Sequence, residues 1–413
     1  MTDDLLARAA ALDEADPLHD RLALFAEAPG VHAYLDGNSL GRPLAALPER
    51  VARFVREDWG TRLIRSWDEA WMELPLRLGD RIAEVALGAA AGQTVVADST
   101  SVLLYKLIRA AVGSRAGTGR TEIVVERGNF PTDRFIVEGI AAETGSTVRW
   151  IDPDPVLGVA ADDVAAAVGA STSVVVLSHV DYRSGALADM AGITRLAHDA
   201  GALVLWDLCH SVGVVPMQLD AWGVDLAVGC TYKYLNGGPG SPAFAYLRAE
   251  HQGLLRQPIQ GWWGAADVFA MGPEYAPAPG IRQLLSGTPP VMSMLGMQGM
   301  LDLIDEAGPD GAPGIEAVRA KSVSLTELAV RAYDELLAPL GVRLLSPRDP
   351  AVRGGHVTIG HPDFRAVTAA LWTQGVIPDF RFPDGIRLGL SPLSTSHVET
   401  VRGVVAVRDA LGR

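Results

Sequence analysis

Two neighbouring segments decide the fold: LVLWDLCHS (residues 203–211) and GCTYKYLNGGPG (residues 229–240). The first begins as a four-residue apolar strand and ends in an acid and a histidine. After a connector and a second apolar strand, predicted at 224–228, a lysine stands between two tyrosines and directly before a glycine-rich turn. Short apolar runs bounded by turn residues are typical of buried strands, so polar chemistry is expected where these two strands end.

The chain before this segment alternates strands with helices. Short strands are predicted at 95–97, 122–126, 147–151 and 173–177, and alanine-rich or apolar helices at 102–112, 160–168 and 193–200. This alternation predicts an α/β fold in which helices cover both faces of a mostly parallel sheet. Ligands of such sheets bind at the carboxyl ends of the strands. Polar clusters fall at four of these ends: Thr100-Ser101, Phe130 to Asp133, Ser178, and Asp207 to His210.

The two ends of the chain have a different pattern. Residues 1–30 predict short surface helices, and a further helix is expected from about Pro43. After Pro290 the sequence predicts a helix at 293–306, a long helix with one apolar face from Ile315 to Leu336, and a small α+β domain. The expected domains are therefore an N-terminal segment that contributes to the small domain (1–60), a large cofactor-binding domain (61–292) and a small C-terminal domain (293–413).

Composition narrows the class of protein. The chain has 413 residues, of which 48% are hydrophobic and 20% charged, which favours a folded protein with a large core. Its net charge of −14 opposes general binding to nucleic acid or anionic membranes. The sequence shows no signal peptide and no membrane span, and its two cysteines form neither a disulfide framework nor a zinc pattern. We expect a cytoplasmic enzyme without a metal.

The residues themselves favour pyridoxal phosphate (PLP) as the cofactor. Lys233 would form the Schiff base, and Asp207 would pair with the pyridine nitrogen so that the ring withdraws electrons. Thr100 and Ser101 precede an apolar helix, whose N-terminus can hold a phosphate. Plainer interpretations stay open: Thr100 or Ser101 as an ordinary N-cap, Asp207 as a cap or ion-pair partner, and His210 as a structural residue. The tryptophans between 59 and 71 more often pack than bind.

The sequence resembles the kynureninases, especially their bacterial branch. The motifs that carry the resemblance occur in family order from about residue 30 to 395: YLDGNSLG (34–41), LIRSW (63–67), DSTS (98–101), NFPTD (129–133), WDLCHS (206–211), GCTYKYLNGGPGS (229–241), GWWG (261–264), GTPP (287–290) and DFR (379–381). The resemblance implies the fold of type I PLP enzymes, the aspartate aminotransferase superfamily. Its large domain holds a mostly parallel seven-stranded sheet flanked by helices, beside a small α+β domain.

The resemblance also implies a role for each site residue. Lys233 would bind the cofactor and act as the base at the substrate Cα, with Tyr232 as proton donor and Asp207 at the ring nitrogen. The remaining cofactor contacts would come from Thr100, Ser101, Phe130, Asp133, Ser178, His210 and Tyr232, and from Trp262 and Thr288 of the neighbouring subunit of a homodimer. Arg381 would bind the substrate carboxylate, while Ser39 and Trp67 would line the pocket for its aromatic end.

The implied reaction is hydrolytic Cβ–Cγ cleavage of L-kynurenine to anthranilate and L-alanine, a step of tryptophan catabolism and NAD biosynthesis. Trp67 stands where family members that prefer 3-hydroxykynurenine have histidine, so unsubstituted kynurenine is expected. Four positions depart from the family pattern: Cys209, Ala265, Phe382 and Ser394. They leave open a kynureninase-like hydrolase acting on a ring-substituted kynurenine in a biosynthetic pathway.

Two further alternatives use the same fold or cofactor. A cysteine desulfurase or class V aminotransferase would share the fold, but a desulfurase needs a nucleophilic cysteine on a loop well after the lysine, and both cysteines precede Lys233. A PLP-binding regulator without catalytic activity is opposed by the acidic charge and by the lack of any DNA-binding motif.

Overall fold

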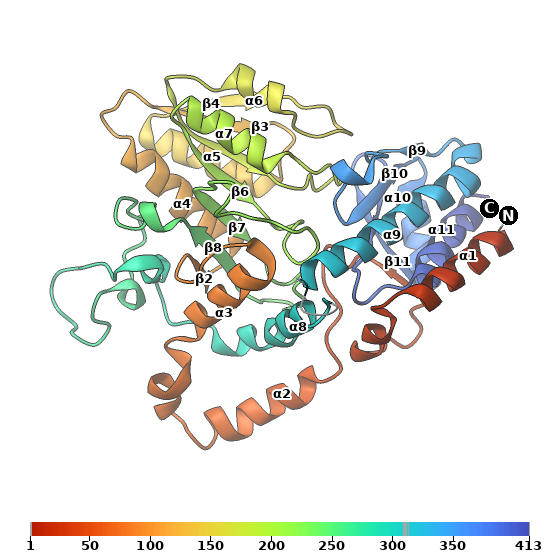
Figure 1. Ribbon diagram of the computed structural model, residues 1–413, viewed down its shortest axis with the longest axis horizontal. Coiled ribbons are helices and arrows are strands. Elements are labelled where there is room, and N and C mark those ends of the chain that lie inside the picture. The colour runs from red at the N-terminus through yellow and green to blue at the C-terminus, as the bar shows by residue number, and fades with distance from the viewer. Residues whose placement is uncertain (1, 309–311, 313, 413) are drawn as a thin grey trace.

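The computed structural model describes residues 2–308, 312 and 314–412. The chain forms two sheets with their helices, which lie side by side (Figure 1). The larger sheet has the order β2-β8-β7-β6-β5-β3-β4, and among its described strands only β8 runs antiparallel to its neighbours. Its strands are β2 (Thr94–Ala97), β3 (Glu122–Glu126), β4 (Thr147–Ile151), β5 (Thr172–Ser178), β6 (Leu203–Asp207), β7 (Leu226–Gly229) and β8 (Ala243–Leu247). The predicted mostly parallel seven-stranded sheet is confirmed.

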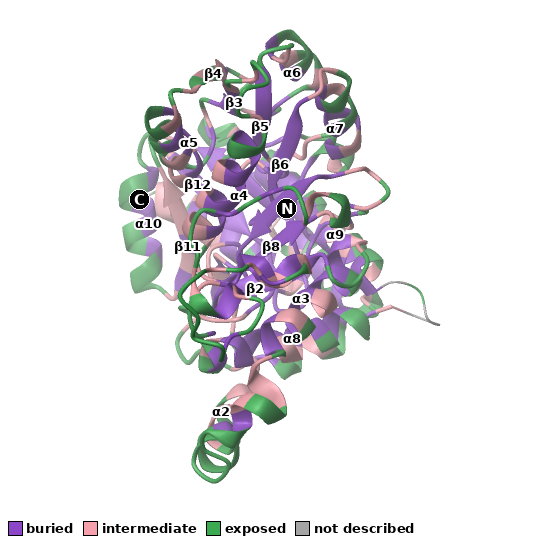
Figure 2. Cartoon of the chain, turned by 90° about the vertical axis from the view of Figure 1, so that its left-hand side faces the viewer, coloured by how far each residue is buried: buried purple, intermediate pink, exposed green. Residues whose placement is uncertain are grey.

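The central strands are buried on both faces, which explains their continuous apolar sequences. Successive side chains of β6 point to opposite faces: Leu203 and Leu205 pack with α4 (Thr100–Ser114) and α5 (Pro131–Thr144). Val204 and Trp206 pack in the core on the other face. The helices on that face are α3 (Leu74–Ile82), α6 (Ala161–Ala167), α7 (Met190–Asp199) and α8 (Leu295–Asp305). Figure 2 shows the buried strands between these layers.

The second sheet has the order β1-β11-β12-β10-β9. Its strands are β1 (Ala33–Leu35), β9 (Arg343–Leu344), β10 (His356–Gly360), β11 (Val376–Arg381) and β12 (Gly385–Gly389). Its helices are α1 (Thr2–Ala15), α9 (Gly314–Leu336), α10 (Phe364–Thr373) and α11 (His397–Leu411). Because β1 pairs with β11, the N-terminal segment lies beside the C-terminal part of the chain. Helix α9 joins both cores, with Val318 in that of the large sheet and Leu325 in that of the small one.

Several elements differ from the sequence predictions. The helix expected from Pro43 begins later, as α2 (Leu47–Arg53), and projects from the body of the molecule (Figure 2). The tryptophan-rich segment, expected to be loop-like, contains wide helical turns at Phe54–Trp59 and Trp67–Trp71. Strands β8 and β11 and helix α3 were not predicted. No helix among the described residues is both long and apolar enough to cross a membrane.

Candidate active site

A cavity of about 190 Å³ opens at the carboxyl ends of β5 and β6. The pairing register explains its position, because Asp207 lies beside Ser178 on one neighbouring strand and Val228 on the other. The structure brings the following predicted site residues into its lining: Thr100, Ser101, Phe130, Asp133, Ser178, Asp207, His210, Tyr232 and Lys233. They come from five separate segments of sequence. The expectation that polar clusters at different strand ends converge is therefore confirmed.

Lys233 is a buried amine whose nearest described partner is an imidazole. Its Nζ lies 2.9 Å from Nε2 of His210, and only 9% of the residue is exposed. The other two lysines are also buried, but Lys106 pairs with Asp98 at 2.5 Å and Lys321 with Asp16 at 2.6 Å. Among the described residues, Lys233 is thus the lysine without a carboxylate ion pair. An amine in such a setting can serve as a nucleophile.

Buried acids face this amine. Asp207 and Asp133 are 7% and 1% exposed, and Asp133 Oδ2 has no hydrogen-bond partner among the described residues. Burial, and then the negative charge of Asp207, raise the pKa of the Asp133 carboxyl well above its ordinary value. Behind them, burial raises the pKa of Glu126 to about 8. A cation placed among these acids, such as a protonated pyridine ring, would favour their ionised forms and offset the burial that raises their pKa values.

The first turn of α4 can hold a phosphate. The N-cap residue of this helix is Ser99, whose side chain makes no capping hydrogen bond, so Thr100 and Ser101 lie inside the helix and are not its caps. The N–H groups of a first helical turn lack partners within the helix and attract anions. The Thr100 hydroxyl lies in the same cavity, with Cys209 Sγ 3.9 Å away. The plainer interpretation of Thr100 and Ser101 as N-caps is wrong.

Aromatic rings border the cavity. Phe130 caps α5, and its ring meets that of Tyr182 edge-on, with centroids 5.2 Å apart. His210 packs edge-on against His356, 5.6 Å away. Burial lowers the pKa of both imidazoles far below the ordinary value, as do positive charges that include Lys233. His210 is therefore neutral at physiological pH and can exchange a hydrogen bond with the amine without competing for its charge.

Two arginines from the small sheet reach towards the cavity. Arg381 ends β11 and pairs with Asp379 at 2.6 Å. Arg387 of β12 is fully buried, donates to Ser39 Oγ at 2.6 Å and lies 3.0 Å from Asp379. Arg387 also donates to the carbonyl oxygen of Tyr182 at 2.7 Å, and Tyr182 lines the cavity. The charges of both guanidinium groups contribute to the lowered pKa of His210. Ser39 and Arg381 do not line the cavity themselves, but Arg387 connects them to it through Ser39 Oγ and Asp379.

Three predicted residues lie elsewhere. Trp67, Trp262 and Thr288 line a second hollow of about 370 Å³ together with Ile64 and Phe269. The ring centroids of Trp67 and Trp262 lie 5.1 and 4.8 Å from that of Trp263, between them. Within one chain, none of the three residues lines the cavity that contains Lys233. Trp67 therefore groups with the residues assigned to the neighbouring subunit.

Sequence reasoning missed four residues around the site: Glu126, Asn129, His356 and Arg387. Asn129 accepts a hydrogen bond from Ser178 Oγ at 2.8 Å and so orients that hydroxyl. Arg387 offered a signal, because it is the one charged residue in the apolar strand sequence GIRLGL (385–390). A charge in a buried strand requires a partner, and Arg387 finds Asp379 across the antiparallel pair.

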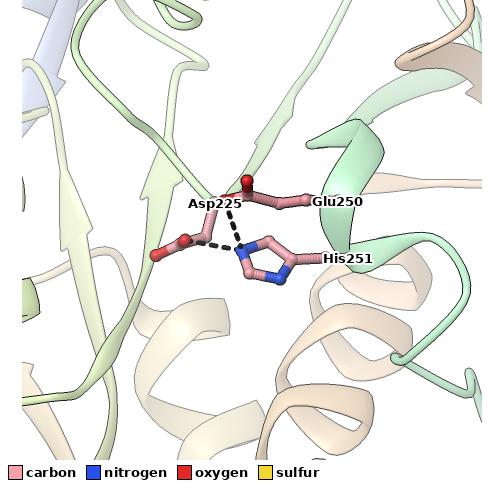
Figure 3. A group of neighbouring side chains, drawn as sticks. All are labelled: Asp225, Glu250 and His251. Carbon is pink, nitrogen blue, oxygen red and sulfur yellow. Dashed lines mark hydrogen bonds and ion pairs between the residues drawn. The ribbon is translucent and has the colours of Figure 1, made fainter.

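A second polar cluster lies at the opposite end of the large sheet. Asp225, directly before β7, is flanked by His198 Nε2 at 2.8 Å and His251 Nε2 at 2.7 Å, and its carboxylate also accepts from the Val204 N–H at 2.8 Å. Figure 3 shows His251 between Asp225 and Glu250, and the three side chains bring metal-ligand atoms within 4.8 Å of one another. The hydrogen bonds already satisfy both oxygens of Asp225, which makes this a structural cluster.

The cavity fits PLP. It supplies a buried amine without a carboxylate ion pair, an unpartnered buried carboxyl oxygen on Asp133, and a helix N-terminus without a side-chain cap. These three features match an aldehyde carbon, a cationic ring and a phosphate dianion. None of the three features is specific by itself, but PLP carries all three of the matching groups in one molecule.

Comparisons with known proteins agree with this fit. A family model described as the kynureninase C-terminal domain matches residues 318–407, and one of the DegT/DnrJ/EryC1/StrS aminotransferase family matches residues 89–218. The kynureninase of Pseudomonas fluorescens is 42% identical over 98% of this chain and 94% of its own length. That of Burkholderia pseudomallei (strain 1106a) has the same identity and coverage.

Solved structures place the fold. A mutant of the enzyme C-DES with glycine covalently linked to its PLP cofactor superimposes with a TM-score of 0.79, covering 91% of this chain and 96% of its own, at 20% identity. A cysteine desulfurase from Thermococcus onnurineus gives 0.77 over 92% and 94%, at 18% identity. These likenesses establish the fold of type I PLP enzymes, as the sequence predicted. They do not indicate which reaction the chain catalyses.

Proposed function

Since the chain belongs to the kynureninase family, we propose that it uses PLP to cleave the Cβ–Cγ bond of L-kynurenine by hydrolysis, giving anthranilate and L-alanine. The relatives at 42% identity are kynureninases, so the desulfurase and aminotransferase alternatives are not favoured. The observation that carries the proposal is the buried Lys233 amine, 2.9 Å from a neutral His210 and facing the Asp207 and Asp133 carboxyls. It supports the proposed roles of these residues.

Bound PLP supplies an electron-withdrawing ring that stabilises negative charge on the substrate carbons beside the amino group. Asp207 would pair with the ring nitrogen and keep it protonated, because a buried carboxylate favours a cation beside it. The first turn of α4, with Thr100 and Ser101, holds the phosphate. Lys233 takes the proton from the substrate Cα, and the neutral imidazole of His210 holds the amine in position.

Tyr232 is the proposed proton donor at Cβ. Burial, followed by the nearby cysteines, raises the pKa of its phenol well above the ordinary value. The hydroxyl therefore stays protonated until it donates, and the lysine amine lies 5.8 Å from the centre of its ring. Tyr232→Phe should leave PLP bound and slow the release of alanine.

Two arginines provide for the substrate carboxylate. Arg381 is one-third exposed and paired with Asp379 on the same strand, so its guanidinium can turn to a carboxylate as a bidentate partner. The fully buried Arg387 also contacts Asp379. Because the Asp379 carboxylate is shared between two arginines, it binds Arg381 less tightly and leaves Arg381 available to the substrate. Ser39, held by Arg387, would face the same end of the substrate.

A homodimer is part of the proposal. Trp67, Trp262 and Thr288 line a hollow separate from the cofactor cavity, and a second chain would present them to the substrate. The surface around them is unusually apolar: Ile64 is 75% exposed and Phe269 60%. Such a surface favours a protein interface. On this arrangement Trp67 also acts across the interface, beside Trp262 and Thr288.

The substrate is best tested by comparing two kynurenines. Purified protein should cleave L-kynurenine faster than 3-hydroxykynurenine, followed as anthranilate fluorescence and as absorbance of the hydroxylated product. Trp67→His should shift the ratio of kcat/KM towards the hydroxylated substrate by about tenfold, or about 1.4 kcal/mol. Trp59→His is the matched control, because this tryptophan is 54% exposed and lies outside both hollows. A wild-type preference for 3-hydroxykynurenine would overturn the assignment of Trp67.

Three of the positions that depart from the family pattern bear on the same question. Ser394 is buried, whereas Phe382 is 71% exposed and stacks with Arg365, 5.5 Å from its ring centre. Ala265 ends the short helical turn that contains Trp262 and Trp263, and Trp262 and Trp263 line the second hollow. A ring-substituted kynurenine stays the second candidate, and its cleavage at a higher kcat/KM than that of L-kynurenine would establish it.

The lysine assignment has its own test. Lys233→Ala should remove the visible absorbance of the lysine-bound cofactor and lower activity by at least about a thousandfold, because both nucleophile and base are lost. Lys321→Ala is the control, because Lys321 is a buried lysine that does not line the cavity. An unchanged spectrum in Lys233→Ala would overturn the assignment of Lys233 as the cofactor-binding lysine. The cytoplasmic location, the role in tryptophan catabolism and NAD biosynthesis, and the domain limits given above stay predictions.

A further inference from the structure

The two cysteines of the chain meet inside the cofactor cavity. In the paired strands β6 and β7, Asp207 lies opposite Val228, and Cys209 and Cys230 each follow two residues later. Neighbouring strands lie about 4.8 Å apart, and both cysteines follow within two residues of the ends of these strands. Cys230 Sγ donates to the carbonyl oxygen of Cys209 at 3.8 Å, so the chain segments remain adjacent beyond the strands.

Both thiols are buried and both line the cavity, with 7% of Cys209 and 1% of Cys230 exposed. A disulfide joins residues whose Cα atoms are about 4.4–6.8 Å apart, a range that includes the spacing of adjacent strands. By the resemblance described above, alanine is usual at the position of Cys209, so this pair departs from the family pattern. The pair thus needs an explanation that the cleavage reaction does not give.

The two thiols differ in acidity. Burial opposes ionisation of Cys230, but its hydrogen bond with Cys209 and the charge of Lys233 outweigh burial and lower its pKa. The hydrogen bond with Cys230, and then burial, raise the pKa of Cys209. One member is therefore the better nucleophile and the other stays protonated until it reacts, which is the arrangement of an attacking and a resolving cysteine.

We propose that Cys209 and Cys230 form a peroxide-sensitive dithiol, whose closure to a disulfide opposes loading of the cofactor. The Cys230 thiolate attacks one peroxide oxygen and becomes a sulfenic acid. Hydroxide leaves and takes up the proton that the Cys230 thiol had released, which gives the first water. The Cys209 sulfur then displaces the hydroxyl, which leaves as a second water with the thiol proton. The two sulfurs lose two electrons and the peroxide gains them.

Closure would act on the cofactor site directly. Cys209 N–H donates to Asp207 Oδ1 at 2.7 Å, and Cys209 Sγ contacts Thr100 Oγ1 at 3.9 Å. Pulling Cys209 towards Cys230 disturbs the residues proposed for the ring nitrogen and the phosphate. In the loaded enzyme PLP fills the space that the oxidant must enter, so the cofactor protects the pair.

The test uses the full-length protein with PLP and after its removal, each treated with hydrogen peroxide. Cys209 and Cys230 fall in one tryptic peptide, residues 196–233, since no lysine or arginine lies between them. In the PLP-free protein we expect this peptide to lose two hydrogens, the free thiols to disappear, and PLP uptake to slow at least about tenfold. Dithiothreitol should restore all three, and the PLP-loaded protein should keep both thiols.

Cys209→Ala, which restores the usual family residue, is the matched control. After peroxide its uptake of PLP should equal that of the same variant untreated, because no intramolecular disulfide can form. The proposal is overturned if the PLP-free wild type keeps both thiols, if it forms only disulfides between chains, or if treated Cys209→Ala loses PLP uptake as the wild type does. None of these measurements uses the cleavage reaction, so failure here is separate from failure of the proposed function.

Discussion

Two buried aspartates on the same sheet have opposite surroundings. Asp225, before β7, accepts hydrogen bonds from two histidines and from the Val204 N–H. Asp207, at the end of β6, accepts one from Cys209 N–H and faces another buried acid, Asp133, which has an unpartnered oxygen. The protein satisfies the first carboxylate by itself. Beside the second it leaves an oxygen of Asp133 without a partner, and an unpartnered buried oxygen identifies the end of the sheet where a ligand binds.

The difference also separates stability from function. A buried carboxylate with its partners in place stabilises the fold, and removing it leaves those partners unsatisfied. A buried carboxylate without a cation does not stabilise the fold, and it gains its partner only when the cofactor binds. Changes at the two ends should therefore affect different measurements.

The largest effect is expected from Asp207→Asn. Asparagine keeps an acceptor for the Cys209 N–H but loses the charge that holds the ring nitrogen protonated. We expect kcat/KM to fall by at least about a thousandfold, near 4 kcal/mol, while the PLP-free protein unfolds at the same or a higher urea concentration. Asp225→Asn is the matched control. The comparison fails if Asp207→Asn keeps activity within tenfold or destabilises the PLP-free protein more than the control does.

Asp225→Ala should do the reverse. It leaves the buried Val204 N–H, His198 and His251 without their acceptor. The free energy of unfolding should drop by about 3 kcal/mol, and kcat of the folded, PLP-loaded enzyme should stay within about twofold. Urea unfolding and steady-state kinetics at a temperature where the variant is folded measure the two quantities. A loss of kcat without a loss of stability would contradict the assignment of this cluster as structural.

Sequence patterns predicted the residues at the cofactor end of the large sheet far better than those at the opposite end. Lys233, Asp207 and Thr100 stand at strand ends or a helix start, where position along the chain already predicts convergence. Asp225 gave no such signal, because its histidine partners come from α7 and from a short 3-10 helix at Ala249–His251, both distant in sequence. A short apolar run also placed Asp225 inside a predicted strand at 224–228. The strand begins only after it, at Leu226.

Other misses have equally local causes. Strand β8 is antiparallel and follows a glycine-rich turn without an intervening helix, so the strand–helix alternation that revealed the other strands did not apply to it. The resemblance assigned Trp67 to the substrate pocket. In the structure it lines a hollow with Trp262 and Thr288, and no sequence pattern around Trp67 predicted this. Tertiary packing of distant segments decides that position, and periodicity carries no information on it.

Glu126 provides a smaller test at the cofactor end. Its folded pKa of about 8 lies above that of an exposed glutamate, about 4.3. The unfolded chain therefore releases this proton at lower pH, and the folded state loses stability as the pH rises from about 4.3 to about 8. Glu126→Gln keeps the acceptor for the Ser178 N–H. In the PLP-free protein it should match the wild type near pH 4 and exceed it by about 2 kcal/mol at pH 8. Equal stabilities at pH 8 would show that Glu126 is ionised at little cost.

The smallest effect should come from His198 at the opposite end. Its hydrogen bond with Asp225 raises the pKa of the imidazole, although burial opposes this. Because the folded pKa exceeds the unfolded value of about 6.5, the stabilisation is complete below that pH and is lost as the pH rises through the folded pKa. His198 is partly exposed, so solvent screening limits the effect of His198→Gln to less than about 1 kcal/mol at pH 6, falling towards zero at higher pH. In an Asp225→Ala background the same substitution should have no effect at either pH. If His198→Gln still causes a pH-dependent loss of stability in that background, His198 has another partner. The contrast between Asp225 and Asp207 would then explain less of the difference between the two ends of the sheet.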